Sequence, residues 1–139
     1  MEPRLDYGKT LPEGLRAVNA LDRYSANCGL EKSLLELIKL RASQINGCTY
    51  CVDMHSKDAR SKGESEQRLY SLSVWREAPY YTDRERAALA LTEAVTLIST
   101  QRVTDEVYAE ASRYFSDEEL VKLVIGISII NVWNRFAIT

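Results

Sequence analysis

The sequence contains little of several features that would assign it to a particular class of protein. It has three cysteines, an odd number that argues against a disulfide framework, and one histidine among 139 residues. Its formal net charge is −2, with both signs interspersed, so we expect no binding to nucleic acid or to an anionic membrane. The longest apolar run, LVIGISIINVW at 123–133, is shorter than the ~20 residues of a membrane-spanning helix and predicts a buried helix.

The chain also begins without the pattern of a secretory signal, because MEPRLDYGKT has no apolar segment after a basic one. We therefore expect a protein of the reducing cytoplasm, where cysteines serve redox chemistry, metal binding or packing. With 45% apolar and 27% charged residues, the whole chain, 1–139, has the content of one domain. No glycine-rich phosphate loop is present, so we expect no directly bound nucleotide and no cofactor.

Capping and helix-breaking residues divide the chain into segments of helical length, and no segment alternates as strands do. This pattern predicts an all-α, single-domain bundle of six to seven helices. The expected helices cover roughly 11–27, 31–46, 48–62, 65–72, 83–99, a segment starting at residue 104, and one from 116 to about 135. Three capping boxes are expected at helix starts: Thr10 with Glu13, Thr82 with Glu85, and Ser116 with Glu119.

The second and third of these helices form a predicted hairpin that turns at Gly47 and carries the reactive side chains. At about 100° per residue, Cys48, Cys51 and His55 share one face of the return helix, about 60° wide. Two cysteines three residues apart in a first turn can form a disulfide, and the positive end of the helix dipole lowers thiol pKa there. His55 follows Cys51 by one turn and is placed to take the proton of its thiol.

Glu36 is the expected partner of this histidine. It precedes the turn by about ten residues and His55 follows it by about eight, so at ~1.5 Å per residue they reach comparable heights on antiparallel helices. Its leucine neighbours indicate partial burial, from which we expect a raised pKa suited to proton transfer. The same set, Glu36, Cys48, Cys51 and His55, also offers four zinc ligands, although structural zinc sites usually pair two separated knuckles.

The run ELIKLRASQINGCTYCVDMH, residues 36–55, resembles the alkylhydroperoxidase D (AhpD)-like proteins of the carboxymuconolactone decarboxylase superfamily. The motif of these proteins is a Glu, then CxxC, then a His four residues after the second Cys. The segments WREAPYYTDRERAALALTEAVT and INVWNR are similar to family segments as well, so the resemblance covers roughly residues 30–139. It implies an all-α bundle of the AhpD type with a central helical hairpin that carries the CxxC pair.

The resemblance further implies a thiol-dependent peroxidase or disulfide oxidoreductase of antioxidant defence, with Cys48 and Cys51 as the redox pair and Glu36 and His55 as a proton relay. Its partners would be a hydroperoxide and a dithiol or protein disulfide, and the chain would form a homo-oligomer, a trimer or hexamer. Proximity to His55 favours Cys51 as the attacking thiol, whereas the helix dipole favours Cys48. Founding members carry a second histidine where this chain has Tyr50, and the decarboxylase branch lacks CxxC, so neither a two-histidine relay nor lactone chemistry is carried over.

Two functions of other classes stay open, a redox-sensing binding protein whose CxxC controls assembly and a structural zinc module. Outside the motif, we expect Cys28 to pack in the interior. Trp75 and Trp133 are expected to fill the core or an interface, with Trp75 a candidate cover for the thiol site. Three polar residues on apolar helices are expected to join hydrogen-bonded networks: Glu93, Asn131 and Arg135.

Overall fold

The computed structural model describes residues 2–139, which form eight α-helices, a short 3-10 helix and no strand. The elements are α1 (Tyr7–Thr10), α2 (Pro12–Ala26), α3 (Lys32–Asn46), α4 (Thr49–Ser61), α5 (Glu66–Ser71), η1 (Leu72–Val74), α6 (Asp83–Thr96), α7 (Asp105–Tyr114) and α8 (Asp117–Ile138). The all-α prediction is confirmed. The structure adds α1, a single turn, to the expected six to seven helices.

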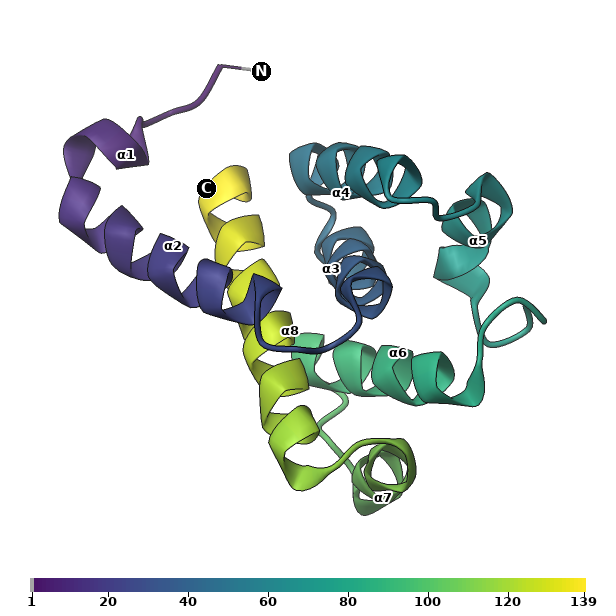
Figure 1. Ribbon diagram of the computed structural model, residues 1–139. Helices are drawn as coiled ribbons and strands as arrows, with labels where there is room; N and C mark the ends of the chain where they lie inside the picture. Colours follow the sequence, from purple (N-terminus) through teal and green to yellow (C-terminus); the bar gives the residue numbers. More distant parts are fainter. Residues whose placement is uncertain (1) are drawn as a thin grey trace.

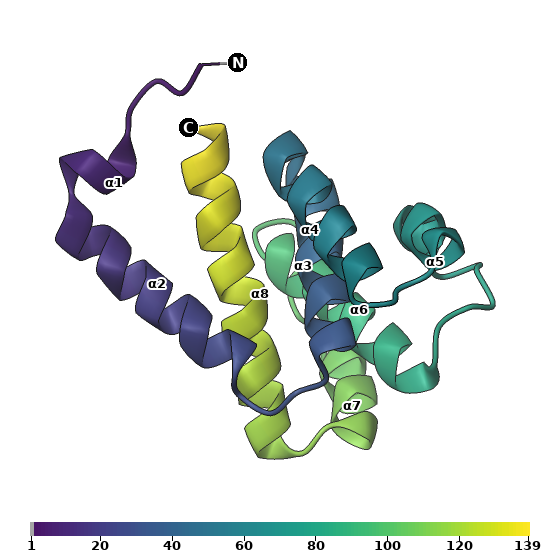
Figure 2. The same cartoon turned by 45° about the horizontal axis from the view of Figure 1, so that its top comes forward.

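Helices α3, α6 and α8 form the centre of the bundle (Figure 1). Helix α3 packs against α4, α6 and α8, and α6 also contacts α7. Figure 2 shows α2 on one side of α8 and the hairpin of α3 and α4 on the other. The long C-terminal helix therefore separates the N-terminal arm, α1 and α2, from the hairpin that carries the CxxC pair.

The core consists of two clusters of buried side chains that share α3. The first joins α3 to α6, α7 and α8, and its large members include Leu34, Leu35, Ile38, Leu91, Leu123 and Ile127. The second joins α3 to α4, α5, η1 and α6, and its members include Leu37, Leu40, Leu72, Trp75 and Leu89. Cys28 packs half-buried against the first cluster, as predicted. Each large apolar side chain buried in this way contributes roughly 1.5–3 kcal/mol, so α3 is the element on which the bundle depends most.

Among the described residues, α8 is the one helix that is long and apolar enough to span a membrane by length and composition. Its side chains at Leu123, Ile127 and Ile130 are buried, as the sequence predicts for this apolar run. At Gly126 the helix comes so close to α3 that an added Cβ would lie 3.3 Å from Ile38 Cδ1. Close packing on α3 thus fixes the position of α8 behind the hairpin.

Several helix ends are fixed by the residues that the sequence indicates. The capping boxes of Thr82 with Glu85 and of Ser116 with Glu119 both form, each with two reciprocal hydrogen bonds to backbone N–H groups. Gly47 ends α3 with a φ of 69°, in the left-handed region that glycine adopts without a steric cost. The chain can therefore reverse sharply at Gly47 and enter α4.

The predicted capping box of Thr10 with Glu13 is wrong. Thr10 is instead the last residue of α1, and its hydroxyl donates to the carbonyl oxygen of Asp6 at 2.7 Å. Helix α2 begins at Pro12 without a side-chain cap, since proline needs no partner for the N–H that it lacks. The Thr10 hydroxyl therefore bonds to the backbone of the turn before it and does not cap α2.

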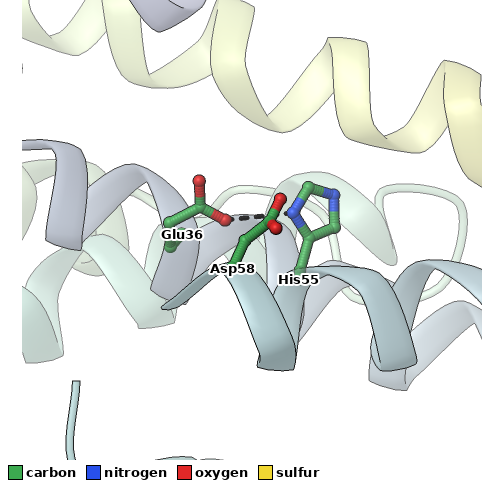
Figure 3. Close-up of side chains that lie close together, drawn as sticks. All are labelled: Glu36, His55 and Asp58. Atoms are coloured by element: carbon green, nitrogen blue, oxygen red, sulfur yellow. Dashed lines mark hydrogen bonds and ion pairs between the residues drawn. The ribbon is translucent and has the colours of Figure 1, made fainter. Parts of the chain in front are cut away.

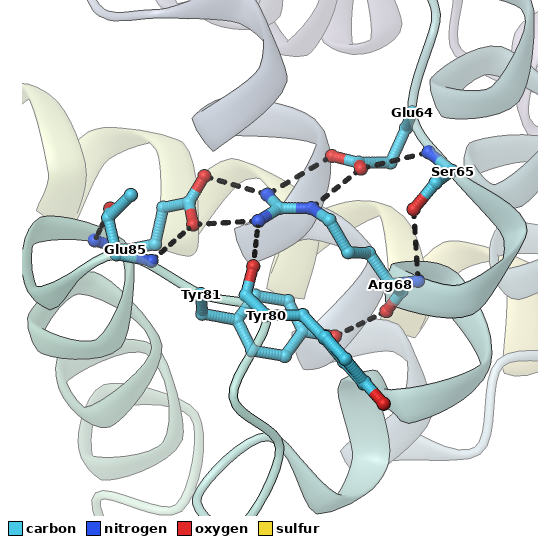
Figure 4. A network of polar contacts seen from close by, with 7 residues as sticks. Glu64, Ser65, Arg68, Tyr80, Tyr81 and Glu85 are labelled. Carbon is cyan, nitrogen blue, oxygen red and sulfur yellow. Dashed lines mark hydrogen bonds and ion pairs between the residues drawn. The ribbon is translucent and has the colours of Figure 1, made fainter.

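An irregular segment between α5 and α6 is held in place by Arg68 (Figure 4). The guanidinium donates from Nε to Glu64 Oε1 at 2.7 Å, from Nη2 to Glu85 Oε1 at 2.7 Å, and also to the carbonyl oxygen of Tyr80. The hydroxyl of Tyr81 donates to the carbonyl oxygen of Arg68. Burial raises the pKa of Tyr81 to about 12, so this hydroxyl keeps its proton and remains a donor.

Glu93 lies buried where this segment meets α3. Its Oε1 accepts hydrogen bonds from Arg41 Nε at 2.9 Å and from Trp75 Nε1 at 2.8 Å, and its Oε2 accepts one from Arg76. Burial alone would raise the pKa of Glu93, but these hydrogen bonds lower it below the usual value, so the carboxylate is charged. Trp75 is thereby held in the second core cluster, as predicted for a core residue.

Candidate functional site

The hairpin turn that leads into the CxxC pair is fixed against α8 by side-chain amides. Asn46 Nδ2 donates to Asn131 Oδ1 and to Asn134 Oδ1, both at 2.9 Å, and Asn134 Nδ2 donates to Ser43 Oγ at 3.0 Å. Arg135 donates to the carbonyl oxygen of Asn131 at 3.0 Å. Asn131 and Arg135 therefore join a network as expected, but this network is separate from that of Glu93.

The two cysteines lie at the start of α4. Cys48 is the N-cap residue, its N–H donates to the carbonyl oxygen of Ser43 at 3.0 Å, and its Sγ accepts from the N–H of Cys51 at 3.3 Å. The Cα atoms of Cys48 and Cys51 are 5.3 Å apart, and the two sulfurs are joined as a disulfide. Both residues are buried, with 1% and 2% of their surface exposed. The pair can thus form a disulfide without leaving the fold.

Glu36 and His55 meet across the hairpin (Figure 3). His55 Nδ1 lies 3.0 Å from Glu36 Oε2, and both residues are buried. The comparable heights expected for these residues on antiparallel helices are confirmed. The other carboxylate oxygen, Glu36 Oε1, accepts a hydrogen bond from Lys62 Nζ at 2.8 Å. Lys62 follows His55 by seven residues, two helical turns, which is the sequence signal that places both on one face of α4.

The expectation of a raised pKa for Glu36 is wrong. Burial alone would raise the pKa, but the hydrogen bonds from His55 and Lys62 outweigh burial and lower the pKa of Glu36 to about 2. An ionised carboxylate only accepts hydrogen bonds, so Nδ1 of His55 is the donor. Nε2 lies on the side of the ring away from Glu36 (Figure 3) and is the nitrogen of this ring that can accept a proton from another group.

Asp58 lies beside this pair as well, and the possible metal-ligand atoms of Glu36, His55 and Asp58 lie within 4.8 Å of one another (Figure 3). Both oxygens of Glu36 already accept hydrogen bonds from other side chains. The sulfurs of the cysteine pair are bonded to each other. The four ligands of the zinc alternative are therefore not assembled as a tetrahedral set in this structure.

A cavity of about 480 Å³ opens beside the pair, between the N-terminal arm and the hairpin, with α8 as a third wall. Cys51 and His55 are among the residues that line it, whereas Cys48 is not among them. Trp133, expected to be a core or interface residue, lines this cavity, and Trp75 does not. Most of the remaining wall is apolar: Leu15, Met54, Ile130, Phe136 and Ala137. This volume is typical of a pocket for a small organic molecule.

The geometry brings one sulfur of a CxxC pair and an imidazole held by a carboxylate to the wall of an apolar cavity. A thiolate at such a position can attack an electrophile, and the second cysteine can then close a disulfide. The molecule is thus an all-α protein with a buried, redox-capable cysteine pair on a helical hairpin.

The chain belongs to the carboxymuconolactone decarboxylase family, whose sequence profile matches residues 12–94. A relative from Bacillus subtilis, the uncharacterized protein YdfG, is 43% identical over 99% of this chain and 94% of its own length. The alkyl hydroperoxide reductase AhpD of Bradyrhizobium diazoefficiens is 38% identical over a shorter stretch, 44% of this chain and 31% of its own. The resemblance to AhpD-like proteins is thereby confirmed.

A crystal structure from Agrobacterium tumefaciens shares the whole fold. This protein of unknown function, ATU0492, has been suggested to be the antioxidant defence protein AhpD. It superposes with a TM-score of 0.96 at 48% identity, over 99% of this chain and 94% of that one.

Proposed function

We propose that the chain is a thiol-dependent peroxidase that needs no cofactor and acts in antioxidant defence, with Cys48, Cys51, His55 and Glu36 as its working residues. The observation that carries this proposal is that Cys51 and His55 both line the cavity. Glu36 is hydrogen-bonded to Nδ1 of this imidazole. Family membership and the similarity to AhpD support the same reaction.

In the first half of the proposed reaction, Nε2 of His55 takes the proton of the Cys51 thiol. The thiolate attacks the terminal oxygen of a hydroperoxide, the O–O bond breaks, and the alkoxide leaves as an alcohol with the proton that His55 returns. Cys51 is then a sulfenic acid. Glu36 stays ionised throughout, because its pKa is about 2, and stabilises the imidazolium that forms.

In the second half, the Cys48 thiol attacks the sulfur of the sulfenic acid, so that a disulfide forms and water leaves. An external dithiol then reduces this disulfide by exchange and is itself oxidised to a disulfide. The balance is one hydroperoxide and one dithiol converted to one alcohol, one water and one disulfide. We assign the attack to Cys51 because Cys51 lines the cavity and Cys48 does not.

The test uses the reduced protein with its remaining thiol, Cys28, as an internal reference. One equivalent of cumene hydroperoxide is expected to remove two titratable thiols and two hydrogen atoms from the intact mass, with the new disulfide mapped to Cys48 and Cys51. Cys48→Ser is expected to stop at a sulfenic acid on Cys51, which dimedone traps. Cys51→Ser is expected to give no rapid reaction.

The result that would reject a peroxidase is a wild-type chain whose thiols and mass stay unchanged under hydroperoxide. If the pair then exchanged rapidly with a protein disulfide, the same residues would serve a disulfide oxidoreductase. Rapid sulfenic acid formation in Cys51→Ser instead of Cys48→Ser would reverse the order of the two cysteines and leave the peroxidase in place.

The proposed setting is the cytoplasm, where dithiol reductants are abundant, and the proposed assembly is a homo-oligomer, a trimer or hexamer, of a one-domain chain. Large apolar side chains that stay exposed support an assembly, and they include Leu11, Val121, Val124 and Ile138. Sedimentation velocity on the full chain tests this, since a monomer at micromolar concentration would contradict it.

A further inference from the structure

One charged side chain in the cavity wall has no role in the proposed reaction. Lys39 extends from α3 into the cavity that Cys51 and His55 also line. Only 8% of its surface is exposed. Its Nζ lies 3.8 Å from Asp22 Oδ1 on α2, a carboxylate whose side chain is 36% exposed. The side chain is thus largely buried beside the cavity, and Asp22 is its one ion-pair partner among the described residues.

The distance between Lys39 and Asp22 is too long for a hydrogen bond. An ammonium group has three N–H donors, and a buried one is costly unless acceptors satisfy it. The charged or titratable side chains on the same cavity wall are Asp22, His55 and two tyrosines, Tyr7 and Tyr50, while most of the wall is apolar. Within residues 2–139, Nζ of Lys39 makes no hydrogen bond, so its N–H groups can donate to a ligand in a largely apolar cavity.

We propose that this cavity binds an amphiphilic carboxylate, with the carboxylate group on Lys39 and the apolar part against the walls formed by α2, α4 and α8. This inference rests on the proposed function, and it names the substrate class as organic hydroperoxides that carry a carboxylate, such as hydroperoxides of medium-chain fatty acids. Lys39 then binds and orients the substrate, and Cys51 performs the attack.

Asp22 has the opposite effect in this arrangement. It competes with the ligand for the same ammonium group from across the cavity, and because it is partly in water it gives up the long ion pair easily. Removal of the lysine charge and removal of the aspartate charge should therefore change the affinity for a carboxylate in opposite directions.

The experiment measures binding of octanoate and octan-1-ol, two probes with the same chain length and different heads, to the full-length protein. Calorimetry gives both affinities, and the fluorescence of Trp133 in the cavity wall provides an independent signal. Lys39→Met is expected to weaken octanoate binding about 10-fold more than octanol binding, the factor for one hydrogen bond to a charged group. Asp22→Asn is expected to strengthen octanoate binding, again relative to octanol.

Equal effects of Lys39→Met on both probes would overturn the proposal. Because replacing a buried lysine can impair folding, Asp22→Asn, at a partly exposed side chain, provides an independent test. Unchanged or weaker octanoate binding by this variant would also overturn the proposal. Lys39→Arg, which keeps the charge, should keep the preference for octanoate. Binding of octanoate needs no turnover, so a protein that selects octanoate but reduces no hydroperoxide would reject the peroxidase and retain the carboxylate site.

Discussion

The charge of Glu36 makes a prediction about stability that can be worked from the structure. Its pKa is lowered from 4.5 to about 2 in the folded chain. A difference of roughly 2.5 pKa units corresponds to about 3 kcal/mol of stability. Since the folded-state pKa lies below the unfolded value, this stabilisation is complete above pH ~4.5 and is lost as the pH falls toward ~2. Glu36→Gln has no charge at this position and should lack this pH dependence.

The assay is urea unfolding of the disulfide form, followed by circular dichroism between about pH 6 and pH 2. The unaltered chain should lose about 3 kcal/mol more than Glu36→Gln over this range. Glu66→Gln is the matched control, since Glu66 forms an exposed surface pair with Arg60, a class of pair worth ~0–1 kcal/mol. Parallel curves for the unaltered chain and Glu36→Gln would show that Glu36 is not held ionised by His55 and Lys62.

Two further substitutions probe the surroundings of the pair. Lys62→Met should raise the pKa of Glu36 and slow the reaction of the thiols with cumene hydroperoxide several-fold, whereas Lys62→Arg should keep the rate. Stopped-flow measurement of thiol loss gives the rates of the two variants and the unaltered chain. Equal rates in all three proteins would contradict a role for Lys62. Asn134→Ala removes one hydrogen bond from Asn46 and one from Ser43 and should cost ~1–3 kcal/mol in urea unfolding, whereas an unchanged stability would contradict a structural role for this amide.

The hairpin was predictable because its geometry follows from short-range rules. A glycine at the turn sets the register of two antiparallel helices, so counting residues from Gly47 places Glu36 opposite His55. The capping boxes at Thr82 and Ser116 were predictable for the same reason, since each involves residues only three apart.

What the sequence did not predict depends on contacts between distant segments. The predicted rise in the pKa of Glu36 is wrong because burial is outweighed by the hydrogen bonds from His55 and from Lys62, which reaches the second carboxylate oxygen from two turns beyond His55. The cavity does not follow from the sequence, because its walls combine helices α1 to α4 with the C-terminal helix α8, which is far from them in the chain. Trp133 and Lys39 line it for that reason, although each looks like an ordinary helix residue in the sequence.

The capping role of Cys48 has a consequence for how the disulfide is reopened. When a reductant attacks a disulfide, one sulfur is attacked and the other departs as a thiolate, and the more stable thiolate departs faster. Sγ of Cys48 accepts the N–H of Cys51 at the positive end of α4, where a negative charge is stabilised. Cys48 is therefore the better leaving group. Incoming thiols would attack Cys51 from the cavity, so both the oxidant and the reductant would use the same entrance.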